Sequence, residues 1–182
     1  LQPEQSESLE IGIEYRQGSY QLSAAMFNQN TDNLIRYQPI TQFTGLNENV
    51  GKASSRGIEF SVSKYWNDFN LSTSLSQTEA RESENGVTSD RVRVPEWSGN
   101  IMASYQKAKT RVWLQAVYRD ERRDFRFYSS DGFNYIREDV MLDGYTVWNL
   151  GASYQLQKSI KLSARIENLS DEDYEEVFSF GT

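Results

Sequence analysis

The chain has 182 residues and a formal net charge of −7, with 26 acidic and 19 basic side chains. It contains neither cysteine nor histidine, which excludes disulfide frameworks, zinc–thiolate sites and catalysis by an imidazole base. The negative charge disfavours nucleic acid as a partner, and no run approaches the ~18 apolar residues of a membrane-spanning helix.

Segments of alternating apolar and polar residues follow one another along the chain. Successive side chains of a strand point to opposite faces, so each segment predicts a strand with one apolar and one polar face. The first is the clearest, because Leu9, Ile11 and Ile13 alternate with polar residues. In chain order, the predicted strands cover residues 7–16, 19–30, 52–65, 69–78, 97–106, 110–119, 145–156 and 160–168.

The connections between these strands alternate between short and long. Residues 17–19, 66–68, 107–109 and 157–159 are short turns, whereas 30–50, 79–96 and 120–143 are long connections. Outer-membrane barrels have short periplasmic turns and long external loops. The sequence therefore predicts an all-β fold, a transmembrane antiparallel up-and-down β-barrel. The strands of a soluble antiparallel sandwich also alternate apolar and polar residues, but they are usually shorter.

Two further patterns bear on which face meets lipid. Aromatic residues gather near the short turns, where Tyr and Trp suit the boundary between lipid and water: Tyr15, Tyr20, Tyr65, Trp66, Phe69, Tyr105 and Tyr154. The predicted lipid face carries Leu9, Ile11, Ile13, Ile58, Phe60, Leu71, Leu75, Leu150, Leu162 and Ile166. Phe27 interrupts the alternation, and the consecutive Val112, Trp113 and Leu114 leave the facing of their strand open.

Several phrases resemble, in family order, those of TonB-dependent outer-membrane receptors. They are LQPEQS at 1–6, DNLI at 32–35, NVGKASSRGIE at 49–59, RVP at 93–95 and ENLSDEDY at 167–174, where Ser170 replaces the usual Phe. Within this family the sequence is most similar to that of cobalamin receptors, chiefly over residues 142–150.

The resemblance implies a barrel of about 22 strands closed by a plug domain. On that basis residues 1–182 represent about eight strands in the C-terminal part of the barrel, and the plug and the final strand lie outside the chain. The expected partners are outer-membrane lipid and lipopolysaccharide, the plug of the same polypeptide, the TonB complex and a small ligand. The implied function is uptake of cobalamin or a ferric siderophore across the outer membrane of a Gram-negative bacterium, with no cofactor.

Two other functions are alternatives to receptor-mediated uptake. A passive porin would lack the receptor phrases. A barrel-embedded hydrolase needs a nucleophile and a base; without histidine no Ser–His pair can form, and no spacing favours a Ser–Lys or an Asp pair.

The resemblance also suggests residues that face the lumen. Gly57 lies beside Glu59, where a missing side chain would let the plug backbone approach. Arg56 and Glu59 would pair with each other in the lumen or with the plug. The alternative is a glycine that bends the strand beside solvated charges.

A second candidate site is the loop over 119–145, which mixes cations with aromatic rings. We expect it to bind ligand through charge-assisted bonds and stacking, with Arg119, Arg123, Arg126, Tyr128 and Tyr135 as the contact residues. Lipopolysaccharide phosphates at the rim would suit the same charges. The alternative is a strand extended above the membrane with a salt-bridged face.

The acidic run at the end of the chain has two readings. Asp171, Glu172 and Asp173 offer the oxygen ligands that calcium prefers, but such runs are more often solvated loops. Asn168 is expected to cap a turn through its side chain.

Overall fold

The computed structural model describes residues 1–39, 44–84, 86–128 and 136–181. The strands are β1 Gln5–Gln17, β2 Tyr20–Pro39, β3 Gly45–Trp66, β4 Phe69–Glu84, β5 Val87–Asp90, β6 Trp97–Lys107, β7 Thr110–Arg119, β8 Arg122–Tyr128, β9 Ile136–Leu142, β10 Tyr145–Gln157, β11 Ile160–Ile166, β12 Glu175–Val177 and β13 Phe180–Gly181. In these described ranges, no helix is long and apolar enough to cross a membrane.

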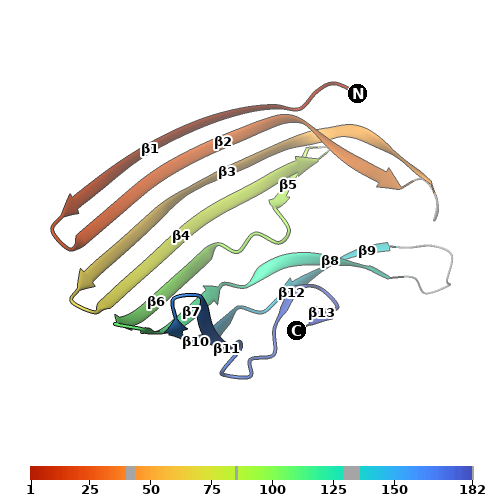
Figure 1. The fold of residues 1–182 in the computed structure, drawn as a ribbon. Coiled ribbons are helices and arrows are strands. Elements are labelled where there is room, and N and C mark those ends of the chain that lie inside the picture. The colour runs from red at the N-terminus through yellow and green to blue at the C-terminus, as the bar shows by residue number, and fades with distance from the viewer. Residues whose placement is uncertain (40–43, 85, 129–135, 182) are drawn as a thin grey trace.

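The long strands form one antiparallel sheet in the order β1-β2-β3-β4-β6-β7-β10-β11, with β5 attached to β4. Each of these strands before β11 pairs with the next long strand of the chain, which confirms the predicted up-and-down, all-β fold. The sheet curves into an open trough, and its edges are β1 and β11 (Figure 1). It is therefore part of a barrel wall rather than a closed barrel.

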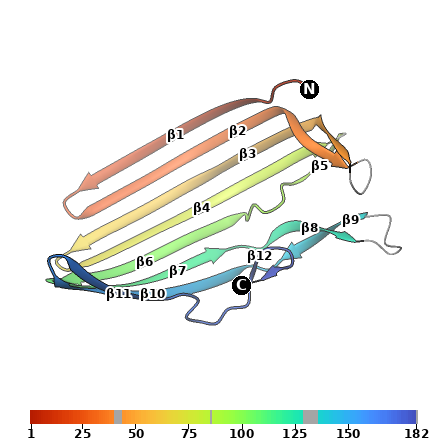
Figure 2. The ribbon, with the colours of Figure 1, turned by 45° about the vertical axis from the view of Figure 1, so that its right-hand side comes forward.

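The two ends of the sheet differ as the connection lengths predict. The four short turns lie together at one end and the long connections at the other (Figures 1 and 2). Three of the turns contain a residue with positive φ: Gly18 at 56°, Asn67 at 49° and Ala108 at 50°. This is the backbone conformation that two-residue hairpins need, so the turn residues help to fix the register of the strands.

The register places most apolar residues of the eight long strands on one face, which we call the apolar face. Directly paired residues share a face, and Ile11 pairs with Met26, which pairs with Ile58. Their exposed fractions are 69%, 62% and 48%, so the chain itself does not cover them. The predicted facing is confirmed, although Leu150 is half-buried.

The register also settles the facing of β7, which the sequence leaves open. Leu114 pairs with Ala103 and Leu150 on the apolar face. Trp113 therefore lies on the opposite, polar face, where it covers Gly151.

Most of the predicted aromatic boundary lies on the apolar face. Phe69 contacts Trp66 and Tyr105, with ring centroids 6.1 and 4.7 Å apart, and the amine of Lys64 lies 4.6 Å from the centre of the Tyr20 ring. Tyr65 lies near its short turn, as predicted, but not on this face. It pairs with Asn70 and lies on the polar face, because its neighbour Trp66 points outward.

Parts of the predicted loops are strands. β2 continues to Pro39, β3 begins at Gly45 and β4 continues to Glu84. In these extensions, which follow the apolar parts of the strands, ion pairs between neighbouring strands stabilise the sheet. Arg36 pairs with Glu82, and the Lys52 amine lies 2.8 Å from Asp32. Residues 120–143 likewise contain the hairpin β8–β9. Because these segments lack apolar alternation, the sequence pattern predicted loops there, with a strand extension over residues 119–145 as the alternative.

Candidate functional site

A row of directly paired residues crosses the polar face of the sheet. Glu59 of β3 pairs with Ser76, Ser76 with Ser98, and Ser98 with Arg119 of β7. We call these four residues the polar shelf. Three inter-strand spacings of about 4.8 Å separate its charged ends by about 14 Å. A hollow of about 460 Å³ lies over it, lined in addition by Ser61, Ser74 and Asn100.

The charged ends of the shelf are available to a partner. In the described part of the chain, neither Glu59 nor Arg119 has an ion-pair partner. One Arg119 nitrogen, Nη1, donates a hydrogen bond to the Tyr118 carbonyl at 3.0 Å. A carboxylate and a guanidinium at opposite ends of a hydroxyl-lined hollow can bind a polar surface that carries both charges.

The prediction that Arg56 faces the lumen with Glu59 is wrong. Arg56 lies on the apolar face of β3. It is three positions from Glu59, and residues an odd number of positions apart in a strand point to opposite faces. Its Nε and Nη2 donate to the Glu79 carboxylate at 2.8 and 2.5 Å. Glu79 is its direct partner on β4.

Gly57 does lie on the polar face, but its open side is occupied. The ring of Phe27 from β2 covers it, and a Cβ at this position would clash with that ring and with the Gln77 carbonyl. Phe27 thus fills the space in which a plug backbone was expected to approach. The glycine is required by its neighbours in the sheet.

The loop arginines form cross-strand ion pairs in the β8–β9 hairpin. Arg123 binds Asp139 at 2.8 Å, and Arg126 binds Glu138 at 2.6 Å. Arg123 and Arg126 lie on opposite faces of the hairpin, because they are three residues apart in one strand. The arrangement is that of a salt-bridged strand extension.

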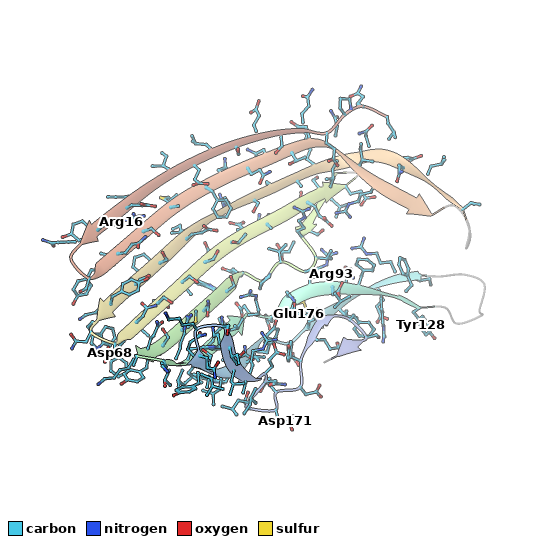
Figure 3. The ribbon with its side chains drawn as sticks, viewed as in Figure 1. Arg16, Asp68, Arg93, Tyr128, Asp171 and Glu176 are labelled. Atoms are coloured by element: carbon cyan, nitrogen blue, oxygen red, sulfur yellow. The ribbon has the colours of Figure 1, made fainter. Side chains whose placement is uncertain are left out.

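Of the two predicted tyrosines, Tyr128 ends β8 and is 53% exposed. It lies far from the short-turn end marked by Arg16 and Asp68 (Figure 3). Tyr135 lies outside the described residues.

A buried carboxylate that no sequence pattern indicates lies at the base of this hairpin. Asp124 is fully buried and accepts hydrogen bonds from Arg93 Nε at 2.8 Å and from the backbone N–H groups of Phe125 and Phe178 at 2.9 Å each. Burial alone would raise the pKa of Asp124, but these donors outweigh it and lower the pKa below its usual value. Asp124 therefore joins three segments as an anion at neutral pH.

A second contact joins the hairpin to the C-terminal segment. Arg122 is 4% exposed and donates to the Glu175 carbonyl at 2.5 Å. Tyr145 donates to the Glu176 carboxylate, and its ring centre lies 4.3 Å from that of Tyr174. Figure 3 shows Glu176 on the same side of the molecule as Arg93. No pattern in the sequence distinguishes these contact residues from the other charged residues around them.

The acidic run near the end of the chain surrounds a turn. The Asn168 side chain donates to the Glu172 carbonyl and accepts from its N–H, at 2.9 Å in both cases, which confirms the predicted cap. No three acidic side chains gather as a metal site among the described residues.

The comparisons with known proteins decide the family. The model of the TonB dependent receptor-like β-barrel family matches residues 1–169. The chain belongs to this family. Its apolar face is therefore the outer surface of a receptor barrel, and its polar face lines the lumen.

Similar proteins include receptors with different cargoes. The vitamin B12 transporter BtuB of Vibrio cholerae is 24% identical over 175 residues, which are 96% of this chain and 27% of that protein. The pyoverdine receptor FpvA of Pseudomonas aeruginosa superposes with a TM-score of 0.76 at 20% identity, over 99% of this chain and 27% of that one. The FrpB iron transporter of Neisseria meningitidis superposes with a TM-score of 0.73 at 16% identity, over 94% of this chain and 28% of that one. The chain thus spans about a quarter of the length of these receptors.

Proposed function

We propose that the chain is the C-terminal wall segment of a TonB-dependent outer-membrane receptor that imports cobalamin or a ferric siderophore. The single observation that carries this proposal is the polar shelf. It offers to the interior of a barrel a carboxylate, Glu59, and a guanidinium, Arg119, that have no ion-pair partner among the described residues. Opposite charges at the two ends of a hollow suit a wall that holds an internal domain or a polar cargo.

The Glu59 end of the shelf is suited to holding a plug. Glu59 and the serines around it face inward over a hollow of about 460 Å³. Hydrogen bonds to charged groups typically contribute about 1.5–3 kcal/mol. In this proposal the plug belongs to the same polypeptide, and the TonB complex releases it to open a path. Arg56 has no part in this contact because it faces outward.

The rim of the barrel is suited to capturing cargo. Among the predicted contact residues, Arg119 is the one cation that has no carboxylate partner in the described residues. Arg123 and Arg126 already hold carboxylates, so a ligand would have to compete with Asp139 and Glu138. We therefore assign Arg119 the main role, with Tyr128 as a stacking surface beside the loop.

Transport without chemistry agrees with the residues present and with the relatives. The chain has no histidine and no cysteine, and the named relatives are transporters and receptors. Cobalamin is the first cargo to test, because BtuB matches almost the whole chain and the sequence of residues 142–150 resembles that of cobalamin receptors.

The test uses the full-length receptor in a host that lacks its own cobalamin and siderophore receptors. Uptake of labelled cobalamin and of labelled ferric siderophores is measured with and without a functional TonB complex. TonB-dependent uptake of one cargo supports the proposal. Equal uptake of small solutes in both strains would instead identify a passive channel.

A further inference from the structure

The outward position of Arg56 places a cationic group just beyond the apolar band. On β3 the outward residues change from Ile58 to Arg56, and on β4 from Leu75 through Gln77 to Glu79 and Arg81. The change occurs on the side of the long connections. These charges therefore lie where the headgroups of one lipid leaflet would lie against the wall.

The two arginines share a single carboxylate. Arg56 Nη2 lies 2.5 Å from Glu79 Oε2, and Arg81 Nη2 lies 2.7 Å from Glu79 Oε1. The group therefore keeps a net charge of +1. The Arg56 and Arg81 side chains are 70% and 55% exposed, so their remaining N–H donors face outward.

Two hollows of opposite character meet at this group. The first, of about 230 Å³, is lined by Asn28, Asn30, Ser54, Arg56, Glu79 and Arg81. The second, of about 450 Å³, is lined mainly by apolar side chains, with Leu9, Ile11, Met26 and Ile58 among them. Asn28, Arg56 and Glu79 line both. A polar donor site thus continues directly into an apolar groove.

This shape and chemistry fit an amphiphile whose anionic headgroup lies beside its chain. We propose that the two hollows bind one lipid A unit of lipopolysaccharide, with a phosphate between Arg56 and Arg81 and an acyl chain along Leu9, Met26 and Ile58. Guanidinium groups bind phosphate oxygens through charge-assisted hydrogen bonds. The proposal rests on the proposed function in one respect, because that function orients the long connections toward the outer leaflet.

Neighbouring charges confine the phosphate to this place. Glu7 pairs in register with Asn30, and Asp90 with Arg81, so both carboxylates flank the first hollow on the same face. Lys52 is neutralised by Asp32 at 2.8 Å. The favourable position for an anion is therefore between the two arginines.

The experiment counts lipids retained by the purified full-length receptor in native mass spectrometry. The probes are bisphosphorylated lipid A, enzymatically dephosphorylated lipid A and phosphatidylglycerol. We expect the Arg56→Gln/Arg81→Gln double variant to retain at least tenfold less bisphosphorylated lipid A. The Glu79→Gln variant should retain more, since it removes the competing carboxylate.

The matched control is Arg111→Gln/Arg165→Gln, which removes two charges from the polar face of the same sheet. Equal retention by the two double variants would overturn the proposal. So would equal binding of dephosphorylated lipid A, or displacement of lipid A by an equal amount of phosphatidylglycerol. If the Arg56/Arg81 variant does not fold, Glu79→Gln alone decides, because unchanged or lower retention contradicts the site. The lipid measurement needs no cargo, so its failure leaves the transport proposal intact, whereas failed cargo uptake with normal lipid retention would count against the transport proposal alone.

Discussion

The ring of Phe27 on β2 lies across Gly57, its direct partner on β3. Trp113 covers Gly151 in the same way on β7 and β10. Both pairs lie on the polar face, where the two large rings interrupt the run of small and polar residues. An aromatic ring over a glycine shields backbone that no side chain would otherwise cover. The apparent faults in the sequence alternation are thus local packing units of the barrel wall.

This relationship predicts the effect of adding one methyl group. Gly57→Ala places a Cβ against the Phe27 ring and the Gln77 carbonyl, and overpacking of this kind costs about 1–3 kcal/mol. Urea titration of the refolded full-length receptor measures the loss. The control is Gly12→Ala on the same face, where the nearest atom would lie at 3.5 Å. Equal midpoints for the two variants would contradict the assigned contact.

The facing of the strands predicts a contrast between two neighbouring apolar residues. Ile101 lies on the apolar face and is 52% exposed, whereas Met102 lies on the polar face. Arginine in the middle of the lipid-facing band costs about 2–4 kcal/mol, so Ile101→Arg should destabilise the barrel by that amount and Met102→Arg by much less. Folding titrations in lipid vesicles compare the two. A larger loss for Met102→Arg would invert the faces.

The sequence predicts this part of the structure well because one rule governs it. Alternation sets the facing of every long strand except β7, and turn residues such as Gly18 and Asn67 set the ends. The same rule already separates Arg56 from Glu59, which are three residues apart and therefore face opposite ways. The wrong prediction for Arg56 came from treating sequence proximity as contact.

The rim is different because its contacts are not periodic. Asp124 is held by Arg93 and by the N–H group of Phe178, 54 residues away in the chain. Nothing local distinguishes this carboxylate from Asp120 or Asp139 nearby. Only the folded register shows which charge is buried and which charges form exposed pairs, so the sequence could indicate a charged loop but not its anchor.

The anchor gives a prediction with a defined pH range. Because the pKa of Asp124 is lowered in the folded state, the stability it contributes is present above its ordinary value of 3.8 and is lost as pH falls through the lower folded value. Asp124→Asn should speed hydrogen exchange at the Phe178 amide at least tenfold at pH 7, which corresponds to about 1.4 kcal/mol.

The difference between wild type and Asp124→Asn should shrink as the pH falls below 3.8. Asp139→Asn serves as the control, because it removes a half-exposed carboxylate from the same hairpin. We expect little change at Phe178 in that variant. Exchange that responds equally to both substitutions would show that Asp124 does not anchor the C-terminal segment.

The sidedness of the barrel can be tested cleanly because the chain has no cysteine. Val87, at the start of β5, is 71% exposed and lies at the end of the long connections, whereas Lys158 lies in a short turn. In whole cells an impermeant thiol reagent should label Val87→Cys and spare Lys158→Cys. After the outer membrane is permeabilised, both should react. Preferential labelling of Lys158→Cys in intact cells would reverse the topology.

The last prediction concerns the unpaired cation of the polar shelf. Arg119 has no carboxylate partner in the described residues, so a ligand can bind it without displacing an ion pair. A charge-assisted bond contributes about 1.5–3 kcal/mol, which predicts that Arg119→Gln weakens cargo binding about tenfold or more. Arg123→Gln should change it far less, because Asp139 already neutralises that side chain at 2.8 Å.

Equilibrium binding of labelled cobalamin and of ferric siderophores to the purified full-length receptor measures both variants. Arg111→Gln is the control, since it removes a lumenal charge near the short turns, far from the rim. Far-ultraviolet circular dichroism checks that each variant keeps its strands. If Arg123→Gln weakens binding and Arg119→Gln does not, the ligand contacts the hairpin above the barrel instead of the shelf, because it must then displace Asp139 to bind.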